Sequence, residues 1–222
     1  LINLRPDHNS IIFDADLGPG VKGGARKLED LTLPVLGHYN ALNALGALAA
    51  SIEAGVSDQV IRSAFASFSG VKRRFSRAGD WQGVAVYDDY AHHPVEIAAV
   101  LRAARMAGNG RILAVLQPHR YTRLQSLFNE FSACLDDADI VVVTPVYSAG
   151  EAPIPGIDRD ELAASLRRHG HPQVMTVDDE QALVETIASV AKSGDLVVGL
   201  GAGTITDWIN ALPSRLASQG RA

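Results

Sequence analysis

The sequence has 222 residues and a formal net charge of −5, from 20 basic and 25 acidic side chains. This balance argues against a protein whose whole surface binds nucleic acid, because such surfaces carry a basic excess. Cys134 is the only cysteine, which excludes a disulfide framework and a cysteine-based zinc site and fits a reducing compartment. No apolar run approaches the roughly 18 residues of a membrane span, so no membrane partner is predicted.

The first 35 residues are predicted to be β structure. Apolar runs at residues 11–13 and 31–33 flank a glycine-rich stretch, a pattern typical of a hairpin. A helix is predicted over residues 40–54, where apolar side chains recur at helical spacing and Gly55 follows as a stop signal. Ser57 is expected to cap a second helix.

After Gly70 strand-like runs alternate with helical patterns. The strands lack polar alternation, which is typical of parallel strands buried on both faces. The sequence therefore predicts the α/β class, with a Rossmann-like, doubly wound and mostly parallel sheet. We place a domain boundary and hinge at residues 69–72, separating 1–70 from 71–222. The expected strands are 84–87, 112–116, 140–143, 173–177 and 196–200, and the expected helices are 94–107, 124–135, 160–169, 178–192 and 204–216.

Ligands of open parallel sheets bind outside the carboxyl ends of the strands, so residues that follow the predicted strands are candidates for the site. The first such segment, residues 88–94, holds two carboxylates, a phenol and two imidazoles. One such residue alone would indicate a turn or a helix cap, but five together favour a functional site. A metal centre is disfavoured because the adjacent His92 and His93 project differently and nothing nearby has ligand spacing.

A second segment, residues 117–123, places Arg120 and Arg123 three apart at a predicted helix start. Two guanidinium groups there suit a carboxylate or a phosphate, and the alternative is a solvated basic turn. Residues 199–203 form a glycine-rich turn between a strand and a helix. This turn indicates either a phosphate cradle or close packing of helix on sheet.

Two further features lie in or beside the first segment of the chain. Asn40 and Asn43 are three apart, so their amides could read an adenine edge; alternatively Asn40 is a helix cap and Asn43 a polar first-turn residue. The basic stretch at residues 72–75 lies on the predicted boundary. It could bind phosphate or be a solvated hinge.

Taken in chain order, these stretches resemble the Mur ligases, the ATP-dependent enzymes that add amino acids to the peptidoglycan precursor. The combination of Asp-Asp-Tyr-x-His-His-Pro with Gln-Pro-His-Arg-Tyr is most similar to the alanine-adding branch of the family. The segments that carry the resemblance are residues 36–44, 70–75, 88–94, 117–123, 150–153 and 201–203.

The resemblance implies the end of a central α/β ATPase domain over residues 1–70 and a whole C-terminal Rossmann-like domain over residues 71–222. The family's P-loop, Gly-x-x-Gly-Lys-Thr/Ser, does not occur in the sequence. We therefore expect a fragment, inactive alone, with the Mg²⁺ ligands and the UDP-sugar domain outside it. The implied enzyme is cytoplasmic and acts on small molecules: ATP, L-alanine and UDP-N-acetylmuramate.

The family also implies roles for individual residues. His92 would be the base for the alanine amine and Arg74 would reach the γ-phosphate of ATP, so both are expected to be catalytic. The implied nucleotide contacts are Tyr39, Asn40, Asn43, Arg74 and Asp89, and the implied contacts to alanine and the acyl phosphate are Tyr90, His92, Arg120 and Arg123.

Two alternatives stay open from the sequence. One is a related ligase that attaches a whole peptide to the same sugar. The other, from a different class, is a non-catalytic nucleotide-binding Rossmann module, supported only by the turn at residues 199–203.

Overall fold

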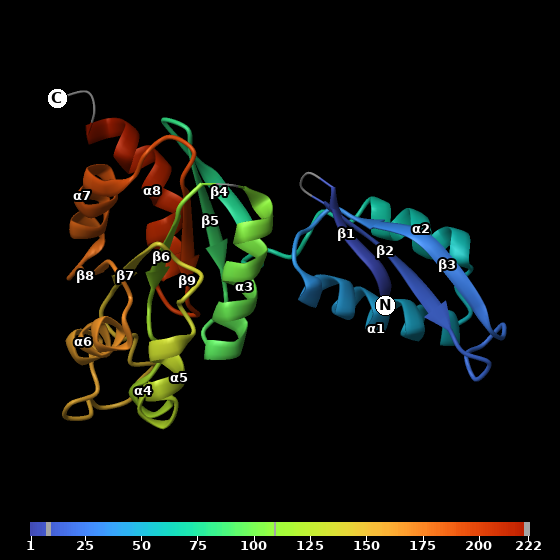
Figure 1. The fold of residues 1–222 in the computed structure, drawn as a ribbon, viewed down its shortest axis with the longest axis horizontal. Helices are drawn as coiled ribbons and strands as arrows, with labels where there is room; N and C mark the ends of the chain where they lie inside the picture. The colour runs from blue at the N-terminus through green and yellow to red at the C-terminus, as the bar shows by residue number, and fades with distance from the viewer. Residues whose placement is uncertain (8–9, 109, 220–222) are drawn as a thin grey trace. The chain divides into compact units, whose positions relative to one another are not determined.

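The computed structural model describes residues 1–7, 10–108 and 110–219. The chain divides into two compact units, Leu1–Val71 and Lys72–Ala222 (Figure 1). The division falls within residues 69–72, where strand-like runs begin to alternate with helical patterns in the sequence.

The first unit contains a three-stranded antiparallel sheet in the order β1-β2-β3. The side chains of Ile11, Phe13 and Ala15 alternate along one face of the central strand and are fully buried. This confirms the predicted hairpin and adds a strand before it. The strands are β1 (Ile2–Asp7), β2 (Ser10–Leu17) and β3 (Arg26–Leu33).

Two helices, α1 (His38–Glu53) and α2 (Asp58–Ala66), pack against this sheet (Figure 1). Helix α1 buries small and aliphatic side chains along one stripe, including Leu48 and Ile52. Gly55 follows it with a φ of 88°, a conformation that glycine adopts without steric cost. Ser57 occupies the N-cap position of α2, but its side chain makes no capping hydrogen bond.

The second unit is built on a six-stranded sheet in the order β4-β5-β9-β6-β7-β8. All neighbouring pairs are parallel except β4 with β5, which confirms the predicted mostly parallel sheet. Every residue of β6, β7 and β9 is buried, as expected for strands covered on both faces. The strands are β4 (Ser76–Trp81), β5 (Val84–Asp89), β6 (Ile112–Leu116), β7 (Ile140–Val143), β8 (Val174–Thr176) and β9 (Leu196–Leu200).

Helices cover both faces of this sheet (Figure 1). On one face α7 and α8 join alternate strand residues, such as Leu113 and Val115, in one apolar core. On the other face α3 packs against β6 and β9, so that the intervening Ala114 is buried as well. The helices are α3 (Pro94–Ala107), α4 (Tyr121–Ser126), α5 (Phe128–Ala133), α6 (Arg159–His169), α7 (Glu180–Val190) and α8 (Ile205–Gln219).

Two details differ from the sequence prediction. The expected helix over residues 124–135 is two short helices, because the backbone of Leu127 leaves the helical region at φ −123° and ψ 28°. Strand β4 was not predicted, and it pairs with β5 through a tight hairpin. Both turn residues, Gln82 and Gly83, have positive φ, as the turns of two-residue hairpins require. In the part of the chain that the structure describes, no helix has the length and apolar character of a membrane span.

Candidate functional site

The polar segments that follow β5, β9, β6 and β7 meet at the carboxyl edge of the second unit's sheet. Backbone hydrogen bonds join them in turn: Gly201 donates to Asp89, and Gln117 donates to Leu200. Tyr147 donates to Pro118 across the β6 and β7 segments. The sheet topology thus gathers the predicted substrate residues at one edge, where ligands of such sheets bind.

Asp89 ends β5 and is 4% exposed. Its Oδ1 accepts the backbone N–H of Ala91 at 2.7 Å, and its Oδ2 accepts that of Phe75 at 2.7 Å. Burial raises the pKa of this carboxyl to about 6, against the lowering effect of the two backbone donors. Both oxygens already accept hydrogen bonds from backbone N–H groups. The predicted contact with the ribose of ATP would therefore use their remaining lone pairs.

Arg74 lies in the turn between the unit boundary and β4, and its side chain is exposed. Its neighbours Arg73 and Phe75 have φ of 61° and 48°, so the turn holds two non-glycine residues in the left-handed region. The positive charge of Arg74 acts on Asp89 to lower its pKa. The γ-phosphate role of Arg74 stays a prediction.

His92 presents one ring nitrogen to a potential ligand. Its Nδ1 lies 2.8 Å from the backbone oxygen of Tyr90. A carbonyl oxygen only accepts, so Nδ1 carries the proton of this hydrogen bond. The neutral imidazole then has a bare Nε2 that can accept a proton. Its neighbour His93 instead caps α3 in a capping box with Glu96, which is the structural role the sequence allowed for it.

Four rings form a row across this edge. The ring of Tyr90 meets that of His92 edge-on at 5.1 Å between centroids. His92 lies 5.5 Å from His119, and His119 stacks on Tyr147 at 5.4 Å. The sequence analysis gives no role to His119 or Tyr147, although His119 lies in the segment 117–123 after a predicted strand. We define these four residues as the ring row.

Arg123 contacts the ring row through His119. Its Nη1 lies 3.3 Å from His119 Nδ1. Because arginine only donates, this nitrogen of His119 is unprotonated and the imidazole is neutral. Burial lowers the pKa of His119. The positive charges of Arg123 and Arg120, and that of His92 when it is protonated, lower this pKa further.

Arg120 differs from the sequence expectation in its local setting. It precedes α4 with a φ of 63°, so helical spacing does not place it beside Arg123. Its Nη1 lies 3.5 Å from Glu151 Oε1, after β7. Glu151 also accepts the side chain and backbone N–H of Thr122, which lower its pKa. The backbone N–H of Arg120 nevertheless donates to the backbone oxygen of Tyr147 at 2.8 Å, so Arg120 also lies beside the ring row.

The glycine-rich segment 199–203, which begins within β9, is explained by close packing. A Cβ on Gly199 would lie 2.2 Å from Ile209 Cγ1 of α8. A Cβ on Gly203 would lie 2.5 Å from both Gln117 Oε1 and Tyr147 Cγ. Gln117 Oε1 also accepts the N–H of Ile205 at the start of α8. The packing alternative therefore accounts for the turn, which leaves little support for the separate nucleotide-binding module.

Three predicted nucleotide contacts lie in the first unit, at the start of α1. Gly37 occupies the N-cap position, so the alternative that made Asn40 the cap is wrong. Asn40 Nδ2 donates to the backbone oxygen of Leu36 at 2.7 Å, while Asn43 is exposed. Tyr39 is half-buried beside them. The adenine roles of Tyr39, Asn40 and Asn43 stay predictions.

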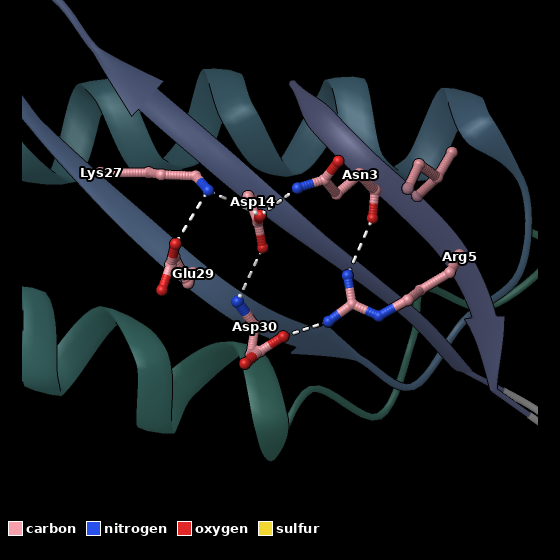
Figure 2. Close-up of a pocket in the computed structure, with 7 residues that line it drawn as sticks. Asn3, Arg5, Asp14, Lys27, Glu29 and Asp30 are labelled. Carbon is pink, nitrogen blue, oxygen red and sulfur yellow. Dashed lines mark hydrogen bonds and ion pairs between the residues drawn. The ribbon is translucent and has the colours of Figure 1, made fainter.

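A second polar cluster lines a pocket on the first unit, on the sheet face opposite the helices (Figure 2). Asp14 is 4% exposed and accepts Asn3 Nδ2 at 2.7 Å and the N–H of Asp30 at 2.9 Å. Lys27 pairs with Asp14 at 3.3 Å, and Arg5 pairs with Asp30. These contacts tie down Asn3 and Asp30, whose φ values are 52° and 54°. These charged side chains pair with one another. We therefore assign the cluster a structural role, which is to stabilise the irregular strand pairing of this sheet.

The residues that the structure describes contain no group of three or more histidine, cysteine or carboxylate side chains that could hold a metal ion. Cys134 is buried, and burial raises the pKa of its thiol to about 12. It is therefore a packing residue and a poor nucleophile.

Residues 73–203, more than half of the chain, match the family model described as Mur ligase, glutamate ligase domain. This chain belongs to the Mur ligase family. It is 53% identical over 220 residues to a UDP-N-acetylmuramate–L-alanine ligase of Rhodopseudomonas palustris strain HaA2, covering 99% of this chain and 47% of that protein. With the ligase of the same name from Bradyrhizobium diazoefficiens it shares 54% over 220 residues, again 99% of this chain and 47% of the relative.

Solved structures of Mur ligases agree in fold. The UDP-N-acetylmuramate–alanine ligase of Thermotoga maritima has a TM-score of 0.74 at 28% identity, over 96% of this chain and 44% of its own. A murein peptide ligase of Psychrobacter arcticus has a TM-score of 0.63 at 22% identity, over 98% and 42%. This Mur ligase chain thus spans about half the length of the curated relatives it matches.

Proposed function

We propose that the chain is part of an ATP-dependent ligase that joins L-alanine to the lactyl carboxylate of UDP-N-acetylmuramate. The observation that carries this proposal is the ring row with two arginines beside it at the carboxyl edge of one sheet. The identity of more than half of all positions with ligases of that name supports the same substrate choice.

The proposed reaction has two steps. The lactyl carboxylate attacks the γ-phosphate of ATP, forming an acyl phosphate and releasing ADP. The amine of alanine then attacks the acyl carbon, and the tetrahedral intermediate expels inorganic phosphate as the amide forms. Mg²⁺, when bound with ATP, would neutralise phosphate charge. The described residues hold no metal cluster, so we assign it no ligands here.

Alanine enters as an ammonium ion and must lose a proton before it attacks. We assign this proton to Nε2 of His92, the nitrogen left bare by the hydrogen bond between Nδ1 and Tyr90. An imidazole is suited to this task because its ordinary pKa of about 6.5 lies near neutral pH.

Arg120 and Arg123 would bind the alanine carboxylate. A guanidinium offers planar, paired donors that match a carboxylate. Each arginine already has one partner in the unit, Glu151 for Arg120 and His119 for Arg123. These partners restrict the side chains before substrate arrives, which lowers the entropic cost of binding.

The test is substrate-dependent phosphate release by the full-length enzyme that carries this segment. We expect release to require ATP, UDP-N-acetylmuramate and L-alanine together, and a peptide in place of alanine to be inactive. Residues 1–222 alone serve as a blank, because they contain no P-loop motif. Activity with the peptide and not with alanine would move the chain to the peptide-attaching branch.

A matched pair of histidine variants tests the base. His92→Gln should lower kcat and remove the acidic limb of the pH profile. His93→Gln changes the adjacent imidazole, which caps α3, and should leave that limb in place. Equal loss in both variants would contradict the assignment of His92.

A further inference from the structure

The side chains of the basic stretch at residues 72–75 lie in different environments. Lys72 and Arg74 are exposed, whereas Arg73 turns into the carboxyl edge of the sheet. Its Nη2 donates to the backbone oxygen of Gly201, after β9, at 2.9 Å. Its Nε lies 3.8 Å from Oδ2 of Asp88, at the end of β5. Arg73 thus spans two neighbouring strand ends.

The same guanidinium covers one face of the Tyr90 ring. Arg73 Cζ lies 4.6 Å from the ring centroid, within the range of a cation–π interaction. His92 meets the same ring edge-on at 5.1 Å. With one face and one edge occupied, Tyr90 is still 46% exposed. Its orientation is therefore set by Arg73 and His92 while part of the ring stays available to a ligand.

Stability alone is a poor explanation for this arrangement. Asp88 is 2% exposed, and its Oδ2 accepts the Thr206 hydroxyl at 2.5 Å. Among the residues that the structure describes, Asp88 Oδ1 and Arg73 Nε are buried without a hydrogen-bond partner. Buried polar atoms without partners lower stability. This network retains two such atoms. Its role is therefore to fix the geometry of the site rather than to stabilise the fold.

The backbone of the turn is held separately from the Arg73 side chain. Tyr90 N donates to the backbone oxygen of Arg73 at 2.8 Å, and Phe75 N donates to Asp89 at 2.7 Å. The Phe75 ring also stacks on Tyr87 at 4.4 Å with 14° between the planes. A change confined to the Arg73 side chain leaves these three contacts in place, and with them the position of Arg74.

We propose that Arg73 is a positioning residue for the amino-acid site, acting through the ring of Tyr90. The inference rests on the proposed function, because it takes Tyr90 to be a contact of the amino-acid substrate. Arg73 itself touches no substrate in this scheme. Its guanidinium fixes the ring plane from the side opposite the ligand, using Gly201 and Asp88 as anchors.

The experiment is a double-mutant cycle in the full-length enzyme, read as the KM for alanine and the KM for ATP. Arg73→Met should raise the alanine KM about tenfold, the order expected for loss of a partly desolvated cation–π contact. The ATP KM should not change. Arg73→Lys should have a smaller effect, because an ammonium keeps the charge but not the planar contact. In the Tyr90→Leu background Arg73→Met should add nothing to the alanine KM.

Arg77→Met is the matched control, since Arg77 lies on β4 and pairs with the exposed Asp80. If Arg73→Met fails to fold, the pair Arg73→Met with Asp88→Asn removes the buried charge together with its partner. Equal effects of Arg73→Met with and without Tyr90 would overturn the proposal, as would an unchanged alanine KM in the folded variant. A wild-type enzyme that does not use alanine would instead refute the proposed function.

Discussion

Asp89 Oδ2 accepts the backbone N–H of Phe75, joining the end of β5 to the turn that carries Arg74. The same carboxylate accepts the N–H of Ala91, which lies between Tyr90 and His92 of the ring row. One buried acid therefore organises the backbone on both sides of the candidate site. The pKa of this acid, raised by burial to about 6, places its charge change near physiological pH.

We expect the amide proton resonances of Phe75 and Ala91 to move downfield together as pH rises through about 6, because the ionised carboxylate is the stronger acceptor. The folded pKa lies above the ordinary value of 3.8. The contribution of Asp89 to the free energy of unfolding is therefore present below pH ~4 and lost as pH rises through ~6. Two-dimensional NMR of the chain measures the midpoint, and Asp89→Asn should abolish the shared transition. Independent midpoints for the two amides would contradict the shared acceptor.

Arg120→Ala and Arg123→Ala should each raise the alanine KM of the full-length enzyme and lower kcat. Loss of one charge-assisted pair corresponds to about ten- to a hundredfold in kcat/KM. Steady-state kinetics with alanine and ATP varied in turn measure the effect. Arg168→Ala, which removes an exposed ion pair with Glu161 on α6, is the control. An effect on the ATP KM alone would make these arginines phosphate ligands.

Gly203→Ala should destabilise the second unit by about 1–3 kcal/mol, the usual cost of overpacking. The added Cβ meets Gln117 and Tyr147 at 2.5 Å, so it also displaces Tyr147 from His119. Urea unfolding followed by the fluorescence of Trp81 and Trp208 reports on this unit. The control is Gly46→Ala in α1, where a Cβ meets nothing within 4 Å. This change lies in the first unit, which contains no tryptophan, so it should leave the fluorescence transition of the second unit unchanged.

Asp14→Asn should destabilise the first unit at neutral pH, because the amide nitrogen would face the donors that the carboxylate now accepts. The backbone N–H of Asp30, followed by the side chain of Asn3, lowers the pKa of Asp14 from 3.8 to about 2. The stabilising contribution is thus complete above pH ~4 and lost as pH falls toward ~2. Amide hydrogen exchange in β2 measures it, with the exposed Asp16→Asn on the same strand as control. Equal protection in both variants would remove the role given to Asp14.

Trypsin should cut the chain first after Lys72. This lysine is exposed at the division between the two compact units, while the next peptide bonds belong to a turn held by Tyr90 and Asp89. Mass spectrometry of a brief digest identifies the first products. Early cleavage elsewhere, with 69–72 intact, would weaken the assignment of this stretch as a hinge.

The buried parallel strands and their helices could be predicted because continuous apolar runs and helical spacing survive in the sequence. Strand β4 could not, since Ser76–Trp81 has no apolar alternation and depends on pairing with β5. The only local signal was the Gln82-Gly83 turn. Likewise the motifs correctly identified which strand ends carry the candidate site. The inward orientation of the Arg73 side chain could not be predicted, because it depends on a hydrogen bond to Gly201, 128 residues away in the chain.

The two edge strands of the six-stranded sheet affect how the second unit should behave when it is studied alone. On one side β8 is only three residues long. On the other side β4 runs antiparallel and carries the charged pair Arg77 and Asp80. Short or charged edge strands are poor templates for strand pairing with a neighbouring molecule. Residues 72–222 should therefore resist intermolecular strand pairing at the concentrations that NMR requires.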